Sequence, residues 1–350
     1  MPEPRRVRAR LGNRQTHPCS GDPSPAGGAL RPEERLKLVI QIPCYNEEES
    51  LPATLADLPE SIDGVDDVEV VVIDDGSTDA TAEVARGCGV RHVVRSPVNQ
   101  GLARAFSVGL DYALKLGADV IVNTDGDGQY RGSDIPRLIA PILHHRADLV
   151  VGNRKPHRVS HFSYSKRWLQ WLGSWIVRGL SGTSVPDVTS GFRAFSREAA
   201  LRMNVVSEFT YTLETIIQAG KKQLFVTHVD VGVNPPRRPS RLFTGIGSYI
   251  LHSIGTIGRI YALYNPLRVF SMIGGLLFLA GSAIGARFLY FYLTEGGAGH
   301  IQSLILAAVL ILMGFQSVLV GLVADLIGSS RWMLEDALLR IRRLELERNE

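Results

Sequence analysis

Two carboxylates that could bind one metal ion stand one residue apart, at Asp125 and Asp127. They follow the short apolar segment 119–123, which predicts a buried strand. Mg²⁺ and Mn²⁺ prefer oxygen ligands and usually keep waters and substrate phosphates in their shell, and Gln129 offers a further oxygen. A cation held there would stabilise negative charge that develops on a phosphate leaving group. The motif therefore indicates a catalytic metal site, with an ordinary turn as the alternative because Asp and Gly are common turn residues. In a metal site, Gly126 would leave room for close approach of the backbone.

A second acidic group follows another predicted strand, at residues 74–79, which read Asp-Asp-Gly-Ser-Thr-Asp. A carboxylate at such a strand end can accept a hydrogen bond from the N–H of a base, and Asp79 can cap the helix that follows. The turn after the first predicted strand contains no glycine, whereas a dinucleotide site needs G-x-G-x-x-G there, and no P-loop occurs. The sequence therefore disfavours these two nucleotide-binding folds.

The segments that must position these carboxylates alternate between strands and helices. Apolar runs and helical patterns predict strands at 38–43, 68–73, 90–95 and 119–123, and helices at 80–86 and 101–116. This alternation indicates an α/β domain with a mainly parallel sheet. Because ligands of such sheets bind beyond the carboxyl ends of the strands, we expect the acidic turns to meet at one edge.

The positive charge of the chain is concentrated in its first residues. The sequence has a formal net charge of +3, while residues 1–37 carry eight Lys or Arg and four Asp or Glu. The rest is close to neutral, which argues against nucleic acid as a partner. Residues 1–36 are rich in Arg, Pro and Gly and contain no apolar run, which predicts a disordered basic tail. The three cysteines have no metal-binding spacing, so reduced thiols are expected.

Two long apolar segments predict a two-helix transmembrane anchor over 266–327. Residues 267–286 and 301–323 are each long enough to cross a hydrocarbon core of roughly 30 Å. Arginines flank the pair of spans, and the loop at 294–300 between them has no Lys or Arg. The positive-inside rule therefore predicts a cytoplasmic catalytic domain and cytoplasmic termini.

Two further helices are predicted beside the anchor. The segment 243–265 has apolar residues at three- and four-residue intervals, which predicts a juxtamembrane amphipathic helix, with a helix packed on the domain core as the alternative. Residues 328–350 are predicted to form a cytoplasmic C-terminal helix. Small residues in the first span would allow a homo-oligomer through the membrane helices: Gly274, Gly275, Gly281 and Gly285.

Five motifs follow one another in a specific order: Pro-Cys-Tyr-Asn-Glu at 43–47, Ile-Asp-Asp-Gly-Ser-Thr-Asp at 73–79, Asn-Gln-Gly at 99–101, Asp-Gly-Asp-Gly-Gln at 125–129 and Thr-Ser-Gly-Phe-Arg at 189–193. Together they resemble family 2 glycosyltransferases of the dolichol-phosphate mannose synthase type, whose bacterial relatives use polyprenyl phosphate. The resemblance covers about residues 38–242. It implies a GT-A catalytic domain, with a Rossmann-like mixed sheet, over 37–242.

The resemblance also implies roles for individual residues. Those that match the nucleotide-sugar site are Pro43, Tyr45, Glu47, Ile73, Asp75, Gly126 and Arg241. Those that match the metal ligands are Asp125, Asp127 and Gln129, and those that match the acceptor-phosphate site are Arg154, Lys166 and Arg167. Asp125, Asp127 and Arg154 are the residues expected to act in catalysis. Arg241 stands where the family has lysine, which keeps the charge and changes its geometry. A structural ion pair between Asp187 and Arg193 is also expected.

The activity that the resemblance implies is transfer of a sugar from GDP-mannose or a UDP-sugar to an undecaprenyl or dolichyl phosphate. An acceptor phosphate is already an anion near neutral pH, so no general base is expected. Catalysis would then rest on positioning and on charge stabilisation by Mg²⁺ or Mn²⁺ and arginines. Direct displacement would invert the anomeric carbon. The sugar, the nucleotide and the prenol length stay open.

Two other functions remain open. A processive or chain-extending membrane polysaccharide glycosyltransferase usually carries a Q-x-x-R-W motif and more spans, and neither occurs here. A non-catalytic membrane adaptor on a transferase fold is disfavoured by the complete acidic motif at 125–127.

Overall fold

The computed structural model describes residues 35–155, 179, 182–183, 185–205, 211–235, 258–259, 261–262, 264–296 and 301–348. The predicted tail over 1–36 lies outside these residues except for its last two, and so does most of the predicted amphipathic helix over 243–265. Both therefore stay predictions.

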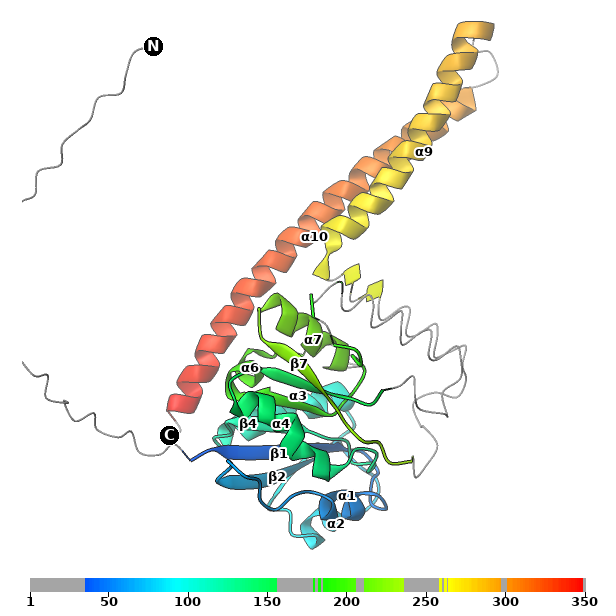
Figure 1. Ribbon diagram of the computed structural model, residues 1–350. Helices are drawn as coiled ribbons and strands as arrows, with labels where there is room; N and C mark the ends of the chain where they lie inside the picture. Colours follow the sequence, from blue (N-terminus) through cyan, green and yellow to red (C-terminus); the bar gives the residue numbers. More distant parts are fainter. Residues whose placement is uncertain are drawn as a thin grey trace, which may run out of the picture. The chain divides into compact units, whose positions relative to one another are not determined.

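A seven-stranded mixed sheet forms the centre of the domain (Figure 1). Its strands are β1 (Lys37–Cys44), β2 (Asp67–Asp74), β3 (His92–Arg95), β4 (Val120–Asn123), β5 (Leu149–Asn153), β6 (Arg193–Ser196) and β7 (Val226–Asp230). The order across the sheet is β3-β2-β1-β4-β6-β5-β7. β6 runs antiparallel to both of its neighbours, and the other paired strands are parallel. The predicted mixed α/β sheet is confirmed.

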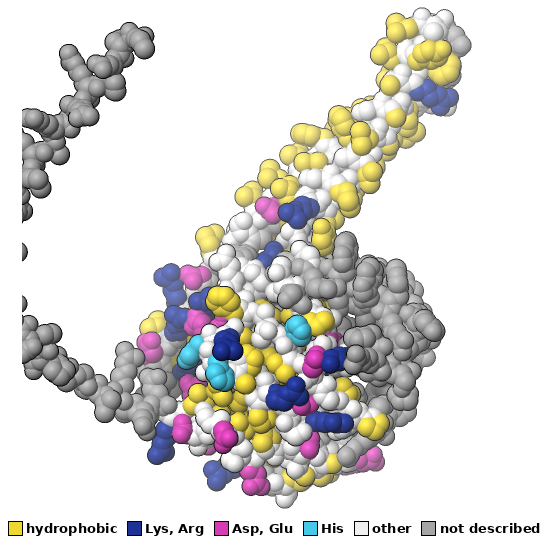
Figure 2. All heavy atoms as spheres, viewed as in Figure 1, with side chains coloured by type: hydrophobic (Ala, Val, Ile, Leu, Met, Phe, Trp, Pro, Cys, Tyr) yellow, Lys and Arg dark blue, Asp and Glu magenta, His cyan; other side chains and the backbone are white. Residues whose placement is uncertain are grey.

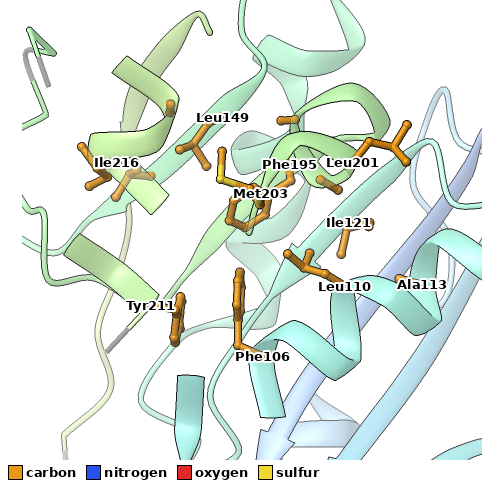
Figure 3. Packing of buried hydrophobic residues seen from close by; sticks show 14 of the residues in the cluster. Phe106, Leu110, Ala113, Ile121, Leu149, Phe195, Leu201, Met203, Tyr211 and Ile216 are labelled. Atoms are coloured by element: carbon orange, nitrogen blue, oxygen red, sulfur yellow. The ribbon is translucent and has the colours of Figure 1, made fainter. Parts of the chain in front are cut away.

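Helices cover both faces of the sheet, which explains why its central strands are continuous apolar runs. One buried cluster joins the sheet to α3 (Leu102–Lys115), α6 (Arg197–Arg202) and α7 (Tyr211–Lys221). In this cluster the ring of Phe106 stacks on that of Tyr211 with centroids 4.0 Å apart (Figure 3). A second cluster joins the sheet to α1 (Leu51–Ala56), α2 (Thr81–Gly87) and α4 (Ile135–Leu143), which follows the short helix η1 (Gly132–Asp134).

The predicted elements around the acidic turns lie within two residues of their observed bounds. The strand predicted at 38–43 is β1, the one at 68–73 is β2, and the helix predicted at 101–116 is α3. The N-cap of α2 is Ala80, whose side chain makes no capping bond, so the predicted cap at Asp79 is wrong. Asp79, one residue before the N-cap, instead accepts a hydrogen bond from the Thr81 N–H (3.0 Å). The local patterns were therefore sufficient to place the parts of the fold that carry the site.

Two helices are long and apolar enough to cross a membrane: α9 (Pro266–Glu295) and α10 (Ile301–Glu347). They pack side by side (Figure 1). Figure 2 shows apolar side chains gathered along both helices. Only 11% and 17% of their most apolar windows are buried, which suits lipid-facing surfaces better than core helices.

Glycines let α9 and α10 approach each other closely. A Cβ at Gly274 would lie 2.6 Å from the Gly314 carbonyl oxygen, and one at Gly281 would lie 2.9 Å from that of Ala307. These glycines therefore serve packing within the chain, so they do not support the predicted homo-oligomer. α10 also continues without a break to Glu347, so the separate helix predicted over 328–350 is an extension of the second span.

Candidate active site

The acidic turns after β1, β2 and β4 meet at one edge of the sheet. β1 pairs in parallel with both other strands, which puts Cys44 opposite Asp74 and Gln41 opposite Asn123. The Asp75 N–H then donates to the Cys44 carbonyl oxygen (2.9 Å) just beyond the strand ends. Residues that are far apart in the sequence are thus neighbours at this edge, as the parallel pattern predicted.

The residues that match a nucleotide site lie on the β1–β2 side of this edge. Tyr45 is 41% exposed, so its ring is available to a base. Glu47 is buried, and its backbone N–H donates to the Thr81 hydroxyl (2.8 Å). Pro43 pairs with Ile73 across the two strands, and the Ile73 side chain has no exposed surface. Ile73 could therefore contact a nucleotide only through its backbone.

Asp75 ties two of the motifs together. Its carboxylate accepts hydrogen bonds from the backbone N–H groups of Gln100 (2.9 Å) and Gly101 (2.8 Å). Burial raises the pKa of Asp75 above its ordinary value, and these two bonds oppose the rise by favouring the charged form. The neighbouring Asp74 accepts from the Ser77 N–H (2.9 Å) in the same way. Backbone amides therefore hold both carboxylates of this turn.

Asp125 and Asp127 lie beyond the end of β4, and both are partly exposed. Asp127 accepts hydrogen bonds from the backbone N–H (3.0 Å) and the side-chain amide (2.6 Å) of Gln129. No residue in the described part of the chain donates a hydrogen bond to Asp125. Burial, and after it the charge of Asp127, raises the pKa of Asp125 to about 7, and Glu47 adds to the effect. The two carboxylates are a repelling pair that a cation would stabilise.

Gly126 stands where the backbone passes close to β1. A Cβ at this position would lie 2.8 Å from Cys44 Sγ, and the Thr54 hydroxyl donates to the Gly126 carbonyl oxygen (3.1 Å). Any larger residue would displace the loop between the two carboxylates. Gly126 was expected to leave room beside it, but in the structure Cys44 at the end of β1 occupies that space.

Gly191 packs directly against the Asp125 carboxylate. A Cβ at Gly191 would lie 3.0 and 3.1 Å from the two Asp125 oxygens and 2.8 Å from the Tyr211 hydroxyl. Asn123 donates both to that hydroxyl (2.9 Å) and to the Gly191 carbonyl oxygen (2.9 Å), and Gln41 donates to Asn123 Oδ1 (2.8 Å). Asn123, Tyr211 and Gln41 are all buried. The floor beneath Asp125 is therefore a fixed hydrogen-bond network.

Arg154 follows β5 and forms a bidentate ion pair with Asp187. Its Nε lies 2.8 Å from Oδ2 and its Nη2 lies 3.0 Å from Oδ1, while Nη2 also donates to the Thr189 hydroxyl (2.9 Å). Burial alone would raise the pKa of Asp187, but the bonds from Arg154 hold it below its ordinary value. Arg154 Nη1 also donates to the Tyr130 hydroxyl (3.4 Å), which accepts from Gly191 beside Asp125. The positive charge of Arg154 lowers the pKa of Asp125. The bidentate bonds to Asp187 therefore hold the Arg154 guanidinium in a fixed orientation near Asp125.

The predicted ion pair between Asp187 and Arg193 is wrong. Arg193 begins β6 with its side chain fully buried in the core, where backbone oxygens surround the guanidinium. The backbone oxygens that accept from it are those of Val188 (2.8 Å), Ser190 (2.7 Å) and Thr212 (2.7 Å). Burial lowers the pKa of Arg193 to about 10. Arg193 therefore shapes the 188–191 turn, and Asp187 pairs with Arg154 instead.

The other cations that the sequence assigned to phosphates, Lys166, Arg167 and Arg241, lie outside the described residues. The described chain before Arg241 ends beside the acidic motif. There the Asn234 N–H donates to the Gln129 carbonyl oxygen (2.8 Å). The Asn234 side chain donates to the Gly128 carbonyl oxygen (3.1 Å).

Sequence reasoning gave no role to three buried residues of the site: Asn123, Tyr130 and Tyr211. The Tyr130 hydroxyl accepts from the Gly191 N–H (3.0 Å), and its ring stacks on Phe192 with centroids 5.1 Å apart. A local signal existed for Asn123 and Tyr130, because they flank the acidic motif. Tyr211 is remote in sequence, and only the packing of α7 brings it to the site.

The acidic pair fits a divalent cation that is bound together with phosphates. Within the described residues, no group of three or more His, Cys, Asp or Glu side chains could hold a metal ion. Mg²⁺ and Mn²⁺ usually complete their shells with waters and substrate oxygens, so two carboxylates suffice. Gln129 donates its amide N–H to Asp127 (2.6 Å) and so holds that carboxylate in place.

Comparisons with known proteins point to one family. The family model described as glycosyl transferase family 2 matches residues 39–202. The undecaprenyl-phosphate mannosyltransferase of Micrococcus luteus is 34% identical over 166 residues, which are 46% of this chain and 66% of that protein. This match thus spans slightly less than two thirds of that relative. The glycosyltransferase AglJ of Haloferax volcanii is 30% identical over 325 residues, which are 87% of this chain and 97% of that protein.

A solved structure has the same fold. Glucosyl-3-phosphoglycerate synthase from Mycobacterium tuberculosis, crystallised with Mn²⁺ and UDP-glucose, aligns with a TM-score of 0.50 and 23% identity over 65% of this chain and 79% of its own. This likeness shows a GT-A type of mixed sheet. The match to AglJ over nearly its whole length, together with the family model, shows that the chain belongs to glycosyl transferase family 2.

Proposed function

We propose that this enzyme transfers a sugar from a nucleotide-diphosphate sugar to a polyprenyl phosphate in the membrane, with inversion of the anomeric carbon. The observation that carries the proposal is the repelling pair Asp125 and Asp127, which lies near the fixed cation Arg154 at the sheet edge. A cation-binding pair beside a fixed arginine suits two phosphate groups that must approach each other despite their charges.

The donor would lie across the sheet edge. Tyr45 and the turn at Asp75 would receive the base and ribose, and the diphosphate would reach Asp125 and Asp127. When bound, Mg²⁺ or Mn²⁺ would supply positive charge against the departing nucleotide diphosphate. The floor formed by Asn123 and Gly191 keeps Asp125 in place while the donor binds.

Arg154 would orient the phosphates on the other side of the site. Its bidentate bonds to Asp187 fix the plane of the guanidinium, so little side-chain freedom is lost when a phosphate binds. The acceptor phosphate is already an anion near neutral pH and can attack the anomeric carbon without a general base. An α-linked donor would then give a β-linked lipid product.

Two observations support a membrane acceptor. The relative from Micrococcus luteus acts on undecaprenyl phosphate by its name. α9 and α10 are candidate membrane spans, so the enzyme would be anchored where such a lipid resides. Because residues 294–300 contain no Lys or Arg, we infer a cytoplasmic domain and a two-span topology with cytoplasmic termini.

Offering the purified enzyme a panel of nucleotide-sugars with polyprenyl phosphate and Mg²⁺ or Mn²⁺ tests the proposal. We expect one labelled sugar to enter the lipid extract, with the anomeric configuration of the product read by NMR. Asp127→Ala should abolish transfer, while Asp63→Ala, a change at an exposed position remote from the site, should not. Equal transfer by Asp127→Ala and wild type would contradict the metal assignment. No transfer from any donor would contradict the proposed acceptor.

A further inference from the structure

The C-terminal part of α10 lies against the domain that carries the active site. About 20 residues suffice to cross a bilayer, whereas α10 has 47. Four residues at spacings of four, three and four face the domain: Glu335, Leu339, Arg342 and Leu346. Leu339 and Leu346 pack on the core cluster formed with α3, α6 and α7. This spacing puts all four on one helix face, which is the docked face.

Arg342 caps the end of α6. Its Nη1 donates to the carbonyl oxygens of Met203 (2.8 Å) and Leu201 (3.3 Å), and its Nη2 lies 3.4 Å from Asp111 of α3. The last carbonyl groups of a helix have no partner within the helix, and a cation there also complements the helix dipole. The contact is therefore specific to this place on the domain.

The C-terminal end of α7 contacts Tyr264, just before α9, and the C-terminal part of α10 through two consecutive lysines. Lys221 donates to the Tyr264 carbonyl oxygen (2.8 Å), two residues before α9 begins, and lies 4.6 Å from the centre of the Tyr264 ring. Lys222 lies 2.9 Å from Glu335 of α10, and both side chains are less than 15% exposed. Partly desolvated pairs of this kind are screened less than surface pairs.

The other end of α7 reaches the active site. Tyr211 is its first residue, and the Tyr211 hydroxyl belongs to the network beneath Asp125. The helix has 11 residues, which corresponds to about 16 Å between its ends. One short helix thus joins the start of α9 and the C-terminal part of α10 to the residues beneath Asp125.

We propose that α7 and the C-terminal part of α10 form a brace that holds the active site at a set position below the bilayer. The brace comprises Lys221, Lys222, Glu335, Arg342 and Arg343, the last of which pairs with Glu198 of α6 (2.8 Å). The inference rests on the proposed function, because an acceptor confined to a membrane can meet Asp125 and Asp127 only where the domain is held at the right height. Misplacement by about 1 Å can cost about 100-fold in rate.

Arg342→Ala in the full chain, reconstituted in lipid vesicles, tests the brace with two acceptors. One is a long-chain polyprenyl phosphate in the bilayer, and the other is a short, water-soluble prenyl phosphate. We expect kcat/KM to fall by about tenfold for the bilayer acceptor and by less than about twofold for the soluble one. Arg342→Lys should recover part of the loss, because lysine can still donate to the Met203 carbonyl oxygen.

Arg340→Ala is the matched control, because Arg340 lies on the same helix with its side chain 78% exposed and pairs only with Asp336 of α10 among the described residues. It should leave both activities unchanged. Lys222→Glu and Glu335→Lys provide a second test: each should lower activity on the bilayer acceptor, and the double variant should recover part of it. Recovery is partial because Lys222 also donates to the Arg202 carbonyl oxygen (2.5 Å), which glutamate cannot do.

Equal losses on both acceptors would indicate a general folding role and overturn the brace, as would unchanged activity of Arg342→Ala in the bilayer. Failure of the swapped pair to recover would also count against it. If the wild type uses neither acceptor, the proposed function fails and the brace falls with it. If the wild type uses both acceptors and Arg342→Ala matches it, the brace alone fails.

Discussion

Two acidic turns at the same sheet edge are built in opposite ways. The carboxylate of Asp75 is held by the backbone N–H groups of Gln100 and Gly101. Asp125 accepts no hydrogen bond from any described residue and faces a second carboxylate instead. Identical side chains, each beyond the end of a parallel strand, thus have different tasks. In the first turn both carboxylates accept hydrogen bonds from backbone N–H groups. In the second, Gln129 donates to Asp127, and Asp125 stays available to a ligand.

The difference is physical as well as positional. A carboxylate that accepts two backbone N–H bonds stabilises the turn that supplies them. A partly buried carboxylate beside another is a source of strain unless a cation binds. Such groups persist where function requires them and the surrounding structure holds them in place. Changes at Asp75 should therefore mainly cost stability, and changes at Asp125 should mainly cost activity.

Asp125→Asn should give the largest effect. Loss of one proposed metal ligand should lower kcat by at least about 1,000-fold, because the charge on the leaving nucleotide would be less stabilised. The unfolding temperature of the metal-free protein should stay equal or rise near neutral pH, since the repulsion from Asp127 is removed. Sugar transfer and thermal unfolding in EDTA measure the two quantities. A fall of several degrees would show that Asp125 serves the fold, and the contrast between the turns would fail.

Arg154→Lys should give the second-largest effect, a loss of about 10- to 100-fold in kcat/KM. Lysine keeps the charge but cannot make the bidentate bonds to Asp187. The buried Asp187 then loses part of its hydrogen bonding, so the unfolding temperature should fall as well. Kinetics at saturating metal and calorimetry check both expectations. Wild-type kinetics would mean that only the charge at this position matters.

Gly191→Ala should lower kcat by about tenfold. The new Cβ would lie 2.8 Å from the Tyr211 hydroxyl and 3.0 Å from Asp125 Oδ1, so the carboxylate must move. Adding Tyr211→Phe removes the nearer of the two atoms and should restore part of the activity. A double-mutant cycle of transfer rates measures this coupling. Independent, additive losses would show that the floor is not a single unit.

The sequence predicted the parts of the site that rest on local pattern. β1, β2, β4 and α3 appeared as apolar runs and a helical period, and the acidic turns follow from where those strands end. The family resemblance added roles for residues such as Asp127 and Arg154. These predictions need only short-range information, because parallel strands align their carboxyl ends.

The rest depends on contacts between distant segments. Nothing near Asp187 in the sequence shows that Arg154 is its partner, and the neighbouring Arg193 was the wrong choice. β6 lies antiparallel between β4 and β5, and this position directs the Arg193 side chain into the core. Tyr211 enters the site only because α7 packs on α3. The sequence pattern alone does not show which distant side chains are in contact, because those contacts depend on the order and direction of the strands.

Asp75→Asn tests the first turn and should cost stability, by about 1–3 kcal/mol. An amide can accept a hydrogen bond from only one of the Gln100 and Gly101 N–H groups, and its own NH₂ then faces the other. The unfolding temperature should fall by several degrees, and nucleotide affinity should fall with it. Thermal unfolding and nucleotide titration check this. An unchanged unfolding temperature would remove the basis for calling this turn structural.

The pH dependence of stability gives the smallest and sharpest test of the contrast. The folded pKa of Asp125 is about 7, against about 3.9 for an unfolded aspartate. Between these values the folded chain binds more protons at this group, so its contribution to stability falls as pH rises from about 4 to about 7. In EDTA the unfolding temperature of Asp125→Asn should therefore rise relative to that of the wild type by a few degrees between about pH 4 and about pH 7. Above about pH 7 the difference should stay constant. For Asp63→Asn, a change at an exposed position, the plot of unfolding temperature against pH should be parallel to that of the wild type. Parallel curves for Asp125→Asn as well would mean that burial and the charge of Asp127 do not disfavour the charged form of Asp125.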